Sequence, residues 1–188
     1  VDDVVIEFHR EPAQRVVAGP APLQDRVTDA INAVISAPHD PDRVRTDATD
    51  MRRRLTEAHA EQAANPWAIK HGPGRMMDIE LLAQAGALIH GLTGLRRPAR
   101  MLSRLVSLGW LDKAEGEHLI TSLARLATLQ QVNRLASDHT IDPATGGAGL
   151  VRLVLSVSGC DDLDTLRTEL AADCARSAAI IEARLAKA

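Results

Sequence analysis

The residues best suited to chemistry gather in one segment, residues 66–84, which reads PWAIKHGPGRMMDIELLAQ. Within this motif segment a turn formed by Gly72, Pro73 and Gly74 leads directly into an apolar stretch that retains carboxylates. Proline lacks an amide hydrogen and glycine adopts backbone angles closed to other residues, so we expect this glycine turn to lie outside any helix. A turn at a helix N-terminus is a geometry that proteins use to bind phosphate. The segment is therefore either a phosphate site or a structural cluster.

The helix after the turn is predicted to begin near Arg75 and to end near Gly91. It is apolar on nearly every side, which is typical of a buried helix. Asp78 falls in its first turn, where a carboxylate suits the free amides and the positive end of the helix dipole. Glu80 and Gln84 are four residues apart and share one face.

A carboxylate on a buried helix needs a partner, and the nearest cations are Lys70 and the arginines at 52–54. In the structural interpretation, Lys70, Asp78 and Glu80 form a polar cluster that holds the loop. In the other interpretation, the glycine turn and Lys70 contact a phosphate. The segment lacks the GxxxxGK[ST] pattern of a P-loop, and structural ion pairs produce similar clusters. The residues alone therefore favour the structural interpretation.

Composition points to a globular fold and excludes several classes of function. The 188 residues are 45% apolar and only 2% aromatic, with a net charge of −3. We expect no nucleic-acid partner, because aromatic stacking residues are scarce, no basic excess is present, and the arginine-rich patches look locally balanced by acids. We expect no membrane partner either, because no apolar run approaches the roughly 20 residues of a membrane span and no secretory signal is visible.

The cysteines and histidines add little chemistry. Cys160 and Cys174 are too few for a disulfide framework, so a reducing cytoplasm is the simplest location. The seven histidines show no metal-ligand spacing, and we expect no metal site. His71, the one histidine in the motif segment, either caps the turn or donates to a phosphate. The chain starts on Val1 and not on Met, which is consistent with a fragment of a longer protein or with an engineered chain.

Hydrophobic periodicity predicts an all-α fold, a bundle of about six or seven helices with mostly antiparallel neighbours. Residues 1–20 are interpreted as a lead or linker from a preceding domain, and 21–188 as one helical domain. Within the lead, residues 1–8, which are rich in β-branched side chains, are expected to form either a strand or a disordered lead. The first helix is expected to turn Val27, Ile31 and Val34 inward. Residues 150–157 are expected to form a short helix, with a strand as the alternative. Helices are predicted over 23–36, 41–64, 75–91, 98–108, 112–137, 150–157 and 162–185, with Asp40 as the N-cap of the second helix and Asp161 as the N-cap of the last.

The motif segment also resembles a known family. Lys70 to Gly74, Asp78-Ile79-Glu80 and Gln84 are similar to a motif of the bifunctional glutamine synthetase adenylyltransferase/adenylyl-removing enzymes, roughly K-x-G-x-G-G-x-x-D-I-E-F-x-x-Q. That motif lies in the helical domain that follows each nucleotidyltransferase domain of the enzyme. Two positions depart from it, because Arg75 replaces a glycine and Leu81 replaces a phenylalanine. Further similarity lies in Arg15 to Gly19, Met51-Arg52 and Gly109 to Leu111.

The resemblance implies the C-terminal helical domain of an enzyme that transfers AMP from ATP to a tyrosine of glutamine synthetase and removes it again. Glutamine and the PII signal protein control that enzyme, which uses Mg²⁺ and ATP. Nucleotidyl transfer in that superfamily needs a Gly-Ser pair and an Asp-x-Asp that holds two metal ions. This sequence contains no such arrangement, and the acids at 161–164 read as helix-start residues. We therefore expect no catalytic residue and no bound cofactor in this chain.

The expected contact residues follow from the same motif. The expected partners are the chain's own nucleotidyltransferase domain, glutamine synthetase and the PII protein. Two alternatives stay open: a separate interaction module that docks glutamine synthetase or PII, and the accessory domain of another protein-modifying nucleotidyltransferase. Residues expected to contact a neighbouring domain or a ligand are Lys70, Gly72, Gly74, Asp78, Glu80 and Gln84, supported by Arg52, His71 and Arg75.

Overall fold

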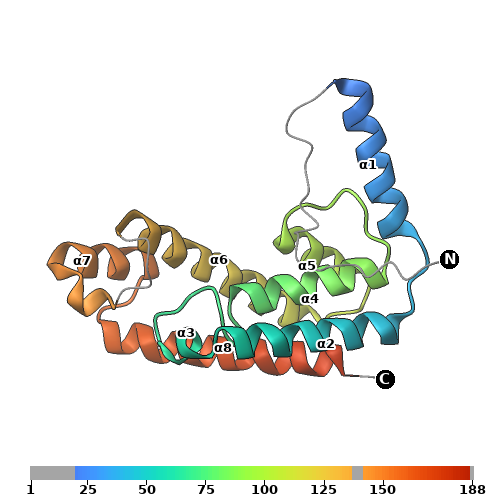
Figure 1. Cartoon of the computed structure of the whole chain (residues 1–188). Coiled ribbons are helices and arrows are strands. Elements are labelled where there is room, and N and C mark those ends of the chain that lie inside the picture. The colour runs from blue at the N-terminus through green and yellow to red at the C-terminus, as the bar shows by residue number, and fades with distance from the viewer. Residues whose placement is uncertain (1–19, 137–141, 187–188) are drawn as a thin grey trace.

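The computed structural model describes residues 20–136 and 142–186, and within these ranges every regular element is a helix (Figure 1). The predicted all-α fold is confirmed. The elements are α1 (Ala21–Ser36), α2 (Pro41–Ala58), α3 (Ala60–Ala64), α4 (Met76–Ile89), α5 (Pro98–Ser107), α6 (Lys113–Ala136), a 3₁₀ turn η1 (Pro143–Thr145), α7 (Gly147–Ser158) and α8 (Leu163–Leu185).

The short helix α3 accounts for the difference from the predicted number of helices. The sequence predicts one long helix from Pro41 to residue 64, but the chain breaks at His59, whose φ and ψ are −120° and 24°. The apolar stripe of α2 ends at Leu55, so no buried face holds the chain helical beyond that point. The predicted cap of α2 is present, since the Asp40 carboxylate accepts a 3.0 Å hydrogen bond from the Asp42 amide.

The centre of the bundle is α4, which packs against α1, α2, α5, α6 and α8. Figure 1 shows α2 and α8 running in opposite directions below α4, and α5 lies beside α4 and α6. The predicted buried helix is thus confirmed, with Ile79, Leu82, Ala83 and Ala85 completely inaccessible to solvent. Because α4 lies against several neighbours, its polar side chains must find partners within the domain.

Helix α1 forms as predicted but does not bury its apolar face. Figure 1 shows it projecting from the rest of the bundle, and none of its residues is buried. The expectation that Val27 and Val34 point inward is wrong: their exposed fractions are 37% and 51%. Ile31 is half-buried. The periodicity was correct, but it does not specify which surface covers an apolar stripe.

The C-terminal part is helical throughout its described range. Residues 150–157 lie within α7, so the strand alternative is wrong. The cap of α8 is Asp162 and not Asp161, because the Asp162 carboxylate accepts a 2.7 Å hydrogen bond from the Thr165 amide. Arg125 on α6 binds Glu169 and Asp173 on α8 at 2.6 and 3.0 Å, which joins the two long helices.

Two expectations concern the chain as a whole. The division at residue 20 stays a prediction, since residues 1–19 lie outside the described ranges, as does the strand or lead expected at 1–8. None of the helices in the described ranges combines the length and the apolar character that crossing a membrane requires.

Candidate functional site

The glycine turn folds the chain back onto the start of α4. Gly72 and Gly74 have φ angles of +131° and +68°, which only glycine adopts easily. The first amides of the helix are occupied from within the loop: Met76 donates to the Ile69 carbonyl at 3.3 Å and Met77 to the Lys70 carbonyl at 3.2 Å. These are the amides that a phosphate would bind at a helix N-terminus. The local geometry thus favours the structural interpretation.

Asp78 is the central side chain of the motif segment. It is buried, and both carboxylate oxygens have partners: Arg52 Nε donates to Oδ1 at 2.8 Å, and the Gly74 amide donates to Oδ2 at 2.7 Å. The Arg52 side chain is 18% exposed. One carboxylate therefore joins α2, the glycine turn and α4. Of the predicted cations, the structure selects Arg52 as the partner.

The glycine turn also lies directly against α8. A Cβ atom on Gly74 would approach the Cys174 carbonyl oxygen to 1.8 Å and the Ala178 amide nitrogen to 2.8 Å. Real Cβ atoms do not approach backbone so closely, so the turn and α8 pack backbone to backbone at this point. The sequence gives no signal for this contact, because Cys174 and Ala178 read simply as small residues of an apolar stripe.

Arg75, which stands where the resembled motif has a glycine, holds the loop that precedes the turn. Its guanidinium donates to the His71 carbonyl at 2.9 Å and to the Ala63 and Asn65 carbonyls at 3.2 and 3.1 Å. The last two carbonyls lie at the C-terminal end of α3, where a cation is favourable. Burial lowers the pKa of Arg75, although the group stays charged. The side chain therefore crosses the loop and leaves the turn geometry intact.

His71 stacks on His59, with ring centroids 3.7 Å apart and an angle of 22° between the rings. Burial, together with the nearby His59 and Lys70, lowers the pKa of His71 to about 4 from its ordinary value of 6.5. His71 is thus neutral at neutral pH and packs as an uncharged ring. The stack joins the start of α3 to the glycine turn.

We expect the pKa of His71 to make the chain less stable in mild acid. The unfolded chain binds a proton at His71 below about pH 6.5, whereas the folded chain does so only near pH 4. The free energy of unfolding should therefore fall as pH is lowered from 6.5 to 4. Urea denaturation across this range should show a smaller fall for His71→Gln than for the wild type. An equal fall in the free energy of unfolding for both proteins would contradict the lowered pKa of His71.

The remaining predicted residues lie around this cluster. Lys70 is exposed, and no carboxylate in the described ranges forms an ion pair with it, so its predicted place in the polar cluster is wrong. Its carbonyl oxygen takes part through Met77 instead. Glu80 and Gln84 on α4 are half-buried. The structure thus brings Arg52, Gly74 and Asp78 into direct contact and leaves the Lys70 side chain outside.

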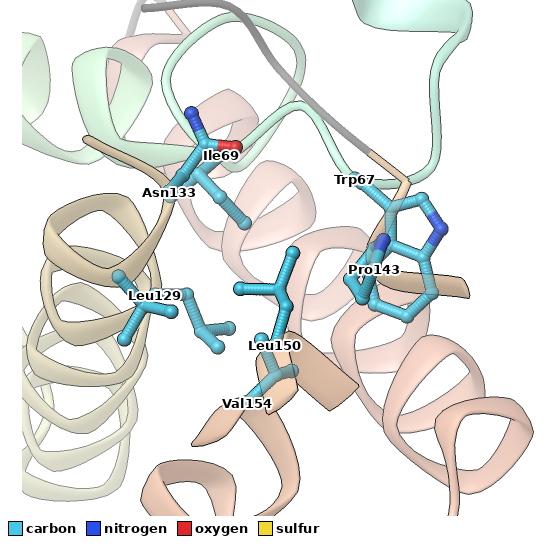
Figure 2. A pocket seen from close by; sticks show the side chains of 8 residues that line it. Trp67, Ile69, Leu129, Asn133, Pro143, Leu150 and Val154 are labelled. Atoms are coloured by element: carbon cyan, nitrogen blue, oxygen red, sulfur yellow. The ribbon is translucent and has the colours of Figure 1, made fainter. Parts of the chain in front are cut away.

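The hollows near this cluster are mostly small. One beside Arg52, His71 and Asp78 has a volume of about 20 Å³, enough for about one water molecule. A second hollow, of about 30 Å³, lies between Trp67, Leu150 and their neighbours and is almost entirely apolar (Figure 2). A groove of about 340 Å³ between α2 and the end of α8 borders the cluster only through Arg52. No group of three or more potential metal ligands occurs in the described ranges.

Comparison with known proteins identifies the family. Residues 45–142 match the family model described as GlnD PII-uridylyltransferase, and this match covers more than half of the chain. A bifunctional glutamine synthetase adenylyltransferase/adenylyl-removing enzyme of Xanthobacter autotrophicus is 34% identical over 173 residues, which cover 89% of this chain and 17% of that protein.

Other relatives carry the same name. The enzyme of Mesorhizobium japonicum is 31% identical and that of Rhodopseudomonas palustris 26% identical, each over 160 residues, 83% of this chain and 16% of the relative. The chain therefore spans about one sixth of the length of these curated relatives. It belongs to the family of the bifunctional glutamine synthetase adenylyltransferase/adenylyl-removing enzymes, as its motif predicted, and matches the related GlnD PII-uridylyltransferase model.

Proposed function

We propose that this chain is the non-catalytic helical accessory domain of an enzyme that transfers AMP from ATP to a tyrosine of glutamine synthetase and removes it again. The observation that carries this proposal is that the polar groups of the motif segment are bound within the domain, in a chain that is related to such enzymes. Asp78 is bound by Arg52 and Gly74, and the first amides of α4 are bound by the loop. These groups maintain the fold, and the resembled catalytic motif is absent from the sequence.

In this proposal the motif segment passes regulatory state to the preceding nucleotidyltransferase domain. Arg52, Gly74 and Asp78 make α2, α4 and α8 one rigid unit, so a displacement at one helix reaches the others. Lys70 and Pro73 are exposed at the outside of this unit, where they are accessible to a neighbouring domain. Glu80 and Gln84 lie further along α4 and would support the same contact.

The exposed Lys70 provides a test in the full-length enzyme. Lys70→Ala should leave stability unchanged because the side chain has no ion-pair partner in the described ranges. If the contact transmits regulation, adenylylation of glutamine synthetase should fall at least about fivefold. The matched control is Lys113→Ala on α6, whose side chain is 83% exposed. Glu80→Ala should also impair adenylylation. Unchanged activity and unchanged stability in both variants would contradict the proposal.

The proposal places ATP and Mg²⁺ in the catalytic domain of the parent enzyme, with glutamine and the PII protein as its regulators and the cytoplasm as its location. The helical chain itself would bind neither ATP nor glutamine. The hollow beside Asp78 supports this view for the motif segment alone, since its volume of about 20 Å³ is far below the roughly 300 Å³ of usual small-molecule sites, whereas the 340 Å³ groove between α2 and the end of α8 reaches that size. Calorimetry with each ligand tests it directly, and measurable heat of binding would overturn it.

A second candidate rests on the family model. Its description names PII-uridylyltransferase, so an accessory domain of an enzyme that modifies PII is the alternative. A third role, as a docking module, predicts that the chain alone binds glutamine synthetase or PII. Mixing the chain with each purified protein separates these possibilities. An accessory domain that contacts only the other domains of its own enzyme should bind neither glutamine synthetase nor PII, whereas a docking module should bind one of them.

A further inference from the structure

A group of exposed arginines lies on α5 and at its start. Arg97, Arg100 and Arg104 project from one side of this helix, and Arg96 directly precedes them. We call these four residues the arginine face. All four are exposed, and none forms an ion pair within the described ranges. The sequence contains no acidic residue between Glu80 and Asp112. The expectation that arginine-rich patches are locally balanced by acids is therefore wrong for this helix.

The position of these charges is unfavourable for the helix itself. Arg97 is the N-cap of α5 and makes no side-chain capping bond, and the first turn contains no acid. Arg96, Arg97 and Arg100 thus lie at the positive end of the helix dipole, where cations are disfavoured. By contrast, α2 carries Asp42 in its first turn, and Arg53 on the same helix pairs with Glu57. An external source of negative charge would relieve the repulsion on α5.

We propose that the arginine face docks a short acidic segment of another protein. Arginine suits this role because its planar guanidinium pairs with carboxylates through two parallel hydrogen bonds. Arg97 and Arg104 are seven residues apart, which is about 10 Å along a helix. That length matches a segment with carboxylates on successive helical turns, which are separated by about 5 Å.

Other polyanions fit this surface less well. Nucleic-acid binding proteins commonly neutralise about six to ten phosphates, more than four arginines provide. The two tryptophans offer no open stacking surface, since Trp67 is buried and Trp110 half-buried. A membrane-surface helix needs a free apolar face, but the apolar residues of α5, Met101, Leu102 and Leu105, are buried in the core. A cluster of protein carboxylates therefore fits the arginine face better than these polyanions.

The test uses the whole chain and a fluorescently labelled peptide of ten glutamates. Fluorescence anisotropy at 50 mM salt should show binding by the wild type. Replacing Arg97, Arg100 and Arg104 together by glutamine should raise the Kd at least about tenfold, because the variant loses three of the four guanidinium groups that pair with the peptide carboxylates. Glutamine retains good helix propensity, and circular dichroism checks that the fold is retained.

The matched control replaces Arg43, Arg53 and Arg54 on α2 by glutamine. These residues are also exposed, and the change in net charge is the same. The control should change the Kd less than twofold. Equal loss in both triple variants would overturn the proposal, because binding would then reflect net charge alone. Absence of peptide binding, or tighter binding of duplex DNA or phosphatidylserine vesicles than of the peptide, would overturn it as well.

Discussion

Replacing Gly74 by alanine should destabilise the chain by about 4 kcal/mol, the largest effect of any single methyl addition in the motif segment. The new Cβ would lie 1.8 Å from the Cys174 carbonyl oxygen, and this atom belongs to the backbone of α8. A side chain would rotate away, but a backbone carbonyl moves only if the helix moves. The φ angle of +68° adds about 1–2 kcal/mol for any residue with a side chain. Urea denaturation of the wild type and the variant measures the difference.

Gly109 provides the matched control for Gly74. Its φ angle is +73°, and a Cβ at that position meets nothing within 4 Å. Gly109→Ala should therefore cost only the backbone term, about 1–2 kcal/mol. The difference between the two variants isolates the contact with α8. If both variants lost the same stability, the close packing of the glycine turn against α8 would be contradicted.

The fold could be predicted well where local signals act alone. The glycine turn, the Asp40 cap and the apolar sequence of α4 each depend on neighbouring residues, and all three appear as expected. The sequence does not predict the break at His59, because no glycine or proline marks the end of α2. The stripe of α1 was correctly located, but its burial depends on what lies against it, which periodicity does not reveal.

The sequence predicts most of the residues that belong to the candidate site, but it does not predict which of them contact one another. The sequence places several cations near Asp78 and gives no reason to prefer Arg52 over Lys70. The choice depends on how α2 crosses α4, a property of the bundle and not of either helix. The contact between Gly74 and Cys174 joins residues 100 positions apart, so no local pattern encodes it. Arg75 departs from the resembled motif, and its role appears only once α3 supplies the carbonyls.

Removing the Asp78 carboxylate should have the second large effect on stability. Asp78→Ala leaves Arg52, which is only 18% exposed, without its 2.8 Å partner, and it also leaves the buried Gly74 amide unpaired. Breaking a buried ion pair by removing one partner typically costs about 3–5 kcal/mol. We expect a loss in this range from urea denaturation. Asp78→Asn keeps the shape and one acceptor oxygen, so it should lose about 2 kcal/mol.

A double-mutant cycle with Arg52 separates the ion pair from general disruption. If the two side chains interact directly, Arg52→Ala combined with Asp78→Ala should cost less than the sum of the single variants by roughly 1–3 kcal/mol. The control pair is Arg43 and Asp47 on α2, whose atoms lie 3.9 Å apart and whose side chains are 66% and 55% exposed. Its coupling should stay below about 0.5 kcal/mol. Additive losses at Arg52 and Asp78 would show that the two residues stabilise the domain separately, so α2 would not be tied to the glycine turn through this carboxylate.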